Sequence, residues 1–168
     1  MVSEYEMKIL AEQLGRLPRE VRAIERYCPL GHPQVIRVYP LIGEKPFPTL
    51  FWLTCPSLIQ QISRLEYQGV IEIVERLVQV DVSFRARYHK DHRTYITERW
   101  AELSEDDRRW VEAKGLRLVF MERGIGGVRD WDTVKCLHMH YAHHQARENV
   151  IGRWLDDHYA IVECQAKS

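Results

Sequence analysis

The sequence contains no uninterrupted apolar run near the roughly 20 residues that a helix needs to cross a bilayer. Its first residues, Met1 to Lys8, carry neither the basic segment nor the apolar segment of a secretory signal peptide. These absences predict a cytoplasmic protein that has no membrane partner. In that compartment cysteines are mostly reduced, so they are expected to act as metal ligands, nucleophiles or core residues rather than as disulfides.

An excess of charge of either sign is also missing. The 24 lysine and arginine residues balance 24 aspartate and glutamate residues, which gives a formal net charge of zero. Nucleic-acid-binding proteins usually carry a strongly basic surface, so nucleic acid is not expected as a partner. The aromatic residues between Phe84 and Trp100 are therefore interpreted as helix packing rather than as a platform for stacking bases.

No internal repeat, low-complexity tract or linker divides the chain. A length of 168 residues predicts one domain, 1–168, with a core at about 27–156 and a helical extension at 1–26. The glycine-rich segment Gly124 to Gly127 is not followed by the lysine and serine of a phosphate-binding loop. It is interpreted as a connecting loop.

The hydrophobic pattern predicts a mainly helical α+β domain packed around a two-stranded antiparallel β-hairpin. The expected strands are 34–42 and 49–54, because both are rich in β-branched or aromatic residues. Before them we expect helices at 3–14, where Ser3 and Glu6 form a capping box, and at 19–27. The helices expected after the hairpin are 56–69, 70–80, 82–103, 104–114, 130–146 and 150–159, and 117–121 is a strand or a helix.

The most distinctive stretch is 135–144, which holds four of the eight histidines beside one of the four cysteines. If it is helical throughout, Cys136, His140 and His143 lie within about 60° of one another, and His138 points to the far side. Such a row suits a metal ion or a reactive thiol. The alternative is a solvated, pH-sensitive helix face.

Two other cysteines, Cys28 and Cys55, are each followed by proline. Proline fixes the backbone beside a ligand, and cysteine–proline steps occur at iron–sulfur clusters. Cys55 also precedes a predicted helix, whose positive end favours a thiolate. Cys136 would supply a third sulfur. The spacing is not that of paired CxxC motifs, however, and three inert core cysteines are the alternative.

Five motifs carry a resemblance to known sequences: CPLGHPQVI at 28–36, PFPTLFWLTCP at 46–56, SRLE at 63–66, VKCLH at 134–138 and NVIG at 149–152. Together they resemble a bacterial family of unknown function, DUF501, over about residues 27–156. The resemblance implies no reaction. It leaves His140 and His144 outside the shared pattern and implies nine recurring polar positions: Cys28, Cys55, Arg64, Glu66, Lys135, Cys136, His138, His143 and Asn149.

These residues predict a metal-binding protein in which Cys28, Cys55 and Cys136 hold an iron–sulfur cluster. An open iron could serve a lyase or desulfurase-like reaction on a small anionic substrate. The catalytic candidates are His138, His143, Lys135 and Glu66, and the substrate-binding candidates are Arg64 and Asn149.

Three alternatives remain open. Zinc could bind the same sulfurs, completed by His138 or His143. A metal-free enzyme could use Cys55 as its nucleophile with a histidine as base, in which case Cys55 is alkylated faster than Cys28. A non-catalytic scaffold or interaction protein would keep its cysteines as core. The sequence does not decide whether the chain is an enzyme or whether it forms a homo-oligomer.

Overall fold

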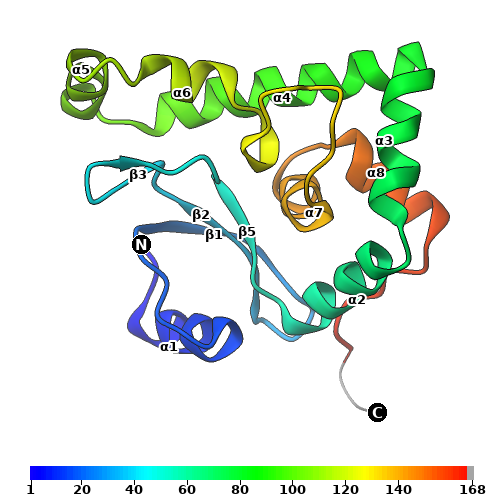
Figure 1. Ribbon diagram of the computed structural model, residues 1–168. Coiled ribbons are helices and arrows are strands. Elements are labelled where there is room, and N and C mark those ends of the chain that lie inside the picture. The colour runs from blue at the N-terminus through cyan, green and yellow to red at the C-terminus, as the bar shows by residue number, and fades with distance from the viewer. Residues whose placement is uncertain (166–168) are drawn as a thin grey trace.

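The computed structural model describes residues 1–165 and is a mainly helical α+β fold, as predicted (Figure 1). The strands are β1 (Val21–Tyr27), β2 (Pro33–Val38), β3 (Leu41–Ile42), β4 (Lys45–Pro46) and β5 (Phe51–Leu53). The helices are α1 (Glu4–Leu14), α2 (Pro56–Tyr67), α3 (Val70–Val80), α4 (Val82–Glu102), α5 (Glu105–Ala113), α6 (Arg117–Glu122), the short 3₁₀ helix η1 (Ile125–Gly127), α7 (Leu137–Ala146) and α8 (Val150–His158).

The main sheet has three antiparallel strands in the order β1-β2-β5 rather than the two that were predicted. β2 and β5 pair as expected, with Val35 opposite Leu53. The error concerns 19–27, which was predicted as a helix but forms β1. Its pairing with β2 shifts register three times, beginning between Val21 and Ala23. These irregularities break the two-residue alternation of a strand, and the apolar spacing then imitates a helix.

Helices cover both faces of this sheet (Figure 1). On one face, Leu10 of α1 packs with Ile36 and Val38 of β2. On the other face, Val35 and Phe51 join the largest hydrophobic cluster, to which α2, α3, α4, α7 and α8 all contribute. Adjacent residues of β2 therefore enter different cores, because successive side chains of a strand point to opposite faces.

Local capping signals set most of the helix boundaries. Ser3 and Glu6 form the predicted capping box of α1, and Gly15 ends that helix in the left-handed conformation. Cys55 is the N-cap of α2, with Pro56 as its first residue. Among the helices of residues 1–165, even the long α4, none is both long and apolar enough to span a membrane.

Helix α7 begins later than the predicted 130–146 helix. It starts at Leu137, and Cys136 is its N-cap rather than a helical residue. The preceding chain is extended and turned, and the Val134 amide donates to the Glu75 carboxylate at 2.8 Å. Cys136 therefore does not lie in one helical row with His140 and His143, as the sequence had suggested.

Helices α7 and α8 pack unusually close together at Gly152. A methyl group on Gly152 would lie 2.1 Å from the Cβ of His144, which is far inside van der Waals contact. Cβ is attached directly to the backbone, so it cannot swing away as the end of a long side chain could. The glycine of the NVIG motif thus permits the contact that holds α8 against α7.

We predict that Gly152→Ala destabilises the protein by about 1–3 kcal/mol, the usual cost of overpacking a core. The measurement is the free energy of unfolding in urea. Gln79→Ala, an exposed change on α3, is the control and should leave this free energy nearly unchanged. An unaltered urea midpoint for Gly152→Ala would show that α8 can move away from α7 at no cost.

Candidate functional site

Three residues of the predicted set meet where α2 faces the start of α7: Glu66, Cys136 and His138. One ligand atom from each lies within 4.8 Å of the other two. Across residues 1–165, no other group of three or more histidine, cysteine, aspartate or glutamate side chains comes as close together. The group joins the SRLE motif to the VKCLH motif.

The Nδ1 atom of His138 is the centre of the group. It lies 3.1 Å from Oε1 of Glu66 and 3.6 Å from Sγ of Cys136. The same Glu66 oxygen accepts a 2.7 Å hydrogen bond from the backbone amide of Leu137, the first residue of α7. Glu66 therefore fixes the start of α7 and directs a carboxylate toward the imidazole.

The other ring nitrogen of His138 is held by α2. Its Nε2 lies 3.0 Å from Oγ of Ser63 and 3.3 Å from the carbonyl oxygen of Ile59. A proton on Nε2 satisfies the carbonyl, which can only accept, and Nδ1 is then the ring nitrogen that faces Glu66 and Cys136. The ring is thus oriented from both sides.

The surroundings favour positive charge at this imidazole. The hydrogen bond with Cys136 raises the pKa of His138, partial burial opposes this, and the charge of Glu66 adds to the rise, so that the pKa is about 9. All three side chains are only half-buried, so the group is open to solvent. The group thus places a carboxylate and a thiol, both of which can become anions, beside one imidazole nitrogen.

The structure does not bring Cys28, Cys55 and Cys136 together. Cys55 caps the start of α2, whereas Glu66, the neighbour of Cys136, follows eleven residues later near its end. Those residues span about 16 Å along a helix. Cys55 is buried, and its Sγ lies 3.6 Å from that of Cys164, which is not among the predicted site residues. Burial and the contact with Cys55 raise the pKa of Cys164 to about 11.

The predicted basic residues adjoin the group in sequence but form no hydrogen bond or ion pair with it. Arg64 is two residues before Glu66, and Lys135 directly precedes Cys136; both side chains are exposed. Within the described chain, neither forms a side-chain hydrogen bond or an ion pair. Each is available to a ligand from solvent.

His143 and Asn149 belong to a separate, buried polar network. The side-chain amide of Asn149 donates to Nδ1 of His143 at 3.1 Å and to Nδ1 of His140 at 3.2 Å. Its oxygen accepts from the amides of Ile151 and Gly152 and so caps α8. Asn149 therefore holds α7 and α8 together, and His140 is part of the core although it lies outside the shared motif pattern.

A third buried histidine, His92 of α4, adjoins this network. Its Nδ1 accepts a 2.9 Å hydrogen bond from the amide of Ile125, and its ring lies 6.2 Å from that of His140. Burial lowers the pKa of His92 and of His143 to about 3 and lowers that of His140 well below its usual range. All three rings are neutral in the folded protein at neutral pH.

A family model described as "Protein of unknown function (DUF501)" matches residues 24–157. This range is most of the chain and contains all nine polar positions of the shared motifs. No curated protein and no solved structure matches the chain. The family match brings no assigned reaction, so the geometry of the site carries the functional argument.

We predict that the buried histidines make the fold sensitive to acid. Their pKa values are about 6.5 when unfolded and much lower when folded, so below pH 6.5 the unfolded chain binds protons that the folded protein rejects. The free energy of unfolding should fall between pH 6.5 and 5, by up to about 1.4 kcal/mol per pH unit for each histidine. Asp91 opposes part of this fall, because burial raises its folded pKa to about 6.

The measurement is urea unfolding at pH 7.5, 6.5, 5.5 and 5.0. His92→Gln, which keeps an acceptor for the Ile125 amide, should flatten the slope, whereas His32→Gln, a change of an exposed side chain, should not. A stability that is constant from pH 7.5 to 5.0 would contradict the assignment of these rings as neutral and buried.

Proposed function

The chain belongs to the DUF501 family, and we propose that it is a metal-binding protein in which Glu66, Cys136 and His138 hold a zinc ion. The observation that carries the proposal is the convergence of a carboxylate, a thiol and an imidazole within 4.8 Å, from two segments that are 70 residues apart. Two anionic ligands and one neutral ligand suit a divalent cation.

The types of ligand favour zinc. Thiolate, imidazole and carboxylate are all common zinc ligands, whereas calcium and magnesium prefer oxygen alone. An iron–sulfur cluster is usually held by three or four cysteines, and this group supplies one. The geometry therefore supports zinc better than the iron–sulfur cluster and the desulfurase-like reaction that the sequence suggested.

The second layer of contacts also supports the proposal. Histidines that bind metal usually donate their other ring N–H to a carbonyl or carboxylate group. The Ile59 carbonyl and the Ser63 hydroxyl lie at Nε2 of His138, so that Nδ1 is the ligating atom. The Leu137 amide orients Glu66 in the same way.

Three protein ligands leave a fourth position for water or substrate, as in catalytic zinc sites. A zinc ion held by the three protein ligands would act as a Lewis acid and lower the pKa of water bound at the fourth position. The exposed Lys135 directly precedes Cys136 and would attract a small anionic substrate, whereas Arg64, two residues from Glu66 on α2, lies on a different face of that helix. This combination supports a lyase or hydrolase reaction, in which Lys135 binds the substrate.

We predict that the purified protein binds one zinc ion per chain. Cys136→Ser, His138→Ala and Glu66→Gln should each weaken zinc binding by about 100-fold or more, and Ser63→Ala, which removes an orienting contact, by about tenfold. Isothermal titration calorimetry on the metal-free protein gives the affinities. Elemental analysis of protein purified without exposure to air identifies the native metal.

Cys164→Ser is the matched control, because it removes a thiol outside the group and should keep the wild-type zinc affinity. The proposal is wrong if Cys136→Ser and Cys164→Ser bind zinc equally well. Bound iron with absorbance near 400 nm would instead restore the iron–sulfur alternative.

A second candidate function is metal-free nucleophilic catalysis by Cys136. Cys136 is partly exposed at the N-cap of a ten-residue helix, and its sulfur lies 3.6 Å from an imidazole nitrogen. Both features are typical of nucleophilic cysteines. Cys55, the nucleophile suggested by the sequence, is only 2% exposed and faces Cys164 rather than a histidine.

We predict that iodoacetamide alkylates Cys136 of the metal-free protein at least about tenfold faster than Cys28 or Cys55, because those two thiols are buried. Mass spectrometry of peptides over time measures the three rates. Zinc should protect Cys136 if it is a ligand. Fast alkylation that zinc does not slow, and that His138→Ala abolishes, would favour the nucleophile. Equal inertness of all three thiols would argue against both functions and for a scaffold.

A further inference from the structure

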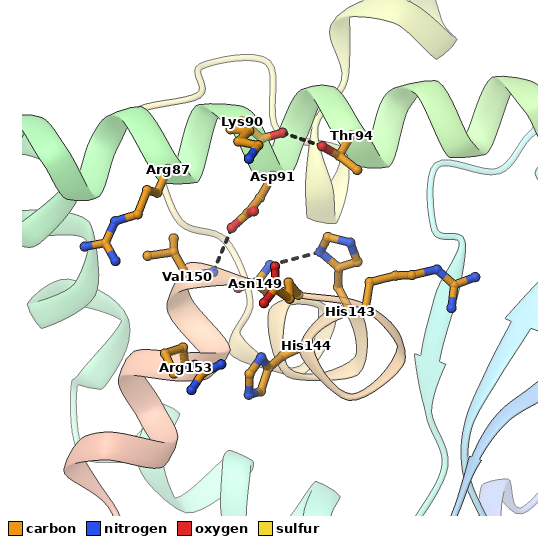
Figure 2. A pocket seen from close by; sticks show the side chains of 11 residues that line it. Arg87, Lys90, Asp91, Thr94, His143, His144, Asn149, Val150 and Arg153 are labelled. Atoms are coloured by element: carbon orange, nitrogen blue, oxygen red, sulfur yellow. Dashed lines mark hydrogen bonds between the residues drawn. The ribbon is translucent and has the colours of Figure 1, made fainter.

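A pocket of about 570 Å³ lies between α4, the end of α7 and the start of α8 (Figure 2). It is at the opposite end of α7 from Glu66, Cys136 and His138, so it is separate from the proposed zinc site. Its volume is within the range of about 300–1,000 Å³ that is usual for small-molecule sites. All three helices, and the loop 147–149 that joins α7 to α8, contribute side chains to the lining of the pocket.

Cationic side chains predominate in the lining. Arg87, Lys90, Arg147 and Arg153 face two acids, Asp91 and Glu148. Arg147 is already paired, at 2.8 Å with Glu25 and at 2.6 Å with Glu98. In contrast, Arg87, Lys90 and Arg153 have no ion-pair partner anywhere in residues 1–165, and all three are exposed.

The carboxylate of Asp91 is already engaged by the protein itself. Asp91 points from α4 to the start of α8, where Oδ2 accepts a 2.7 Å hydrogen bond from the Val150 amide (Figure 2). The positive end of the helix dipole offsets its charge. Asn149 takes the next two amides of α8, so the helix start offers these donors to no ligand. Recognition in this pocket must come from side chains.

The inner wall is polar and uncharged. His143 lines the pocket and is almost completely buried, and its Nδ1 accepts from Asn149. Because burial keeps this imidazole neutral, it adds no charge to the wall. The free charge of the pocket is therefore set by three unpaired cations at its rim and by Asp91 and Glu148.

We propose that this pocket binds a small phosphate-bearing molecule, with Arg87, Lys90 and Arg153 as its phosphate ligands. A phosphate monoester has three terminal oxygens and carries up to two negative charges, so it can engage more of these cations than a carboxylate group can. Arginine also binds phosphate through two parallel N–H···O bonds. This inference does not rest on the zinc site.

The test is calorimetry with three probes: inorganic phosphate, pyrophosphate and glycerol 3-phosphate. Arg87→Gln and Arg153→Gln should each weaken binding by about tenfold or more, as expected for a charged hydrogen bond. Asp91→Asn removes a like charge but keeps an acceptor for the Val150 amide, so it should strengthen binding severalfold. Arg76→Gln, an exposed arginine on α3 outside the pocket, is the matched control and should bind as the wild type does.

Binding of inorganic phosphate or pyrophosphate alone supports a site for the free anion, and preference for glycerol 3-phosphate supports an esterified ligand. Failure of all three probes to bind the wild type overturns the proposal, as does binding that Arg87→Gln and Arg153→Gln leave unchanged. Cys136→Ser should retain phosphate binding. This variant therefore separates a failure of the pocket from a failure of the zinc site.

Discussion

Helix α7 lies at the centre of the fold, yet four of its ten residues are histidines (Figure 1). A buried imidazole must stay neutral and find hydrogen-bond partners, because an unpaired polar group in a core is costly. Each of the four rings has a hydrogen-bond partner in α2, in α8 or at the N-cap of α8. His138 is held by α2, His140 and His143 share Asn149, and His144 lies 2.9 Å from the Asp156 carboxylate of α8. The positions of α2 and α8 around α7 follow from these needs.

This constraint explains why the motifs are spread along the chain. The SRLE motif supplies the carboxylate that meets the start of α7, and the NVIG motif supplies both the amide that bridges two histidines and the glycine that lets α8 approach. The surroundings of Cys28 and Cys55 are explained by the local backbone. Each follows an extended segment and precedes a turn or helix, and both are buried. Their proline neighbours are accounted for by the backbone without a metal.

The sequence could predict what local chemistry determines. Ser3, Pro56 and Asn149 mark helix starts, and the fold class follows from the pattern of apolar residues. The start of α7 could not be predicted, because the backbone amides of Leu137 at this start and of Val134 before it are held by Glu66 and Glu75, which lie 71 and 59 residues away. The same separation in sequence, about 70 residues between Glu66 and Cys136, also kept the site from being predicted. Glu66, Cys136 and His138 were all candidates, but placing Cys136 inside a helix turned His138 away from it.

The two ends of α7 differ in the charge that they attract. At its first turn, a carboxylate and a thiol adjoin one imidazole nitrogen, the arrangement proposed to hold zinc. Near its last turn, three cations without ion-pair partners in residues 1–165 line the pocket proposed to bind phosphate. His138 and His143 are five residues apart, which is about 7.5 Å of rise and roughly 140° of rotation. The two sites therefore open on different faces of one rigid helix. Helix α7 is packed on the sheet and on α8, so its side chains cannot move without disturbing the core. A ligand bound at either end of α7 would therefore stabilise the folded protein through the same helix.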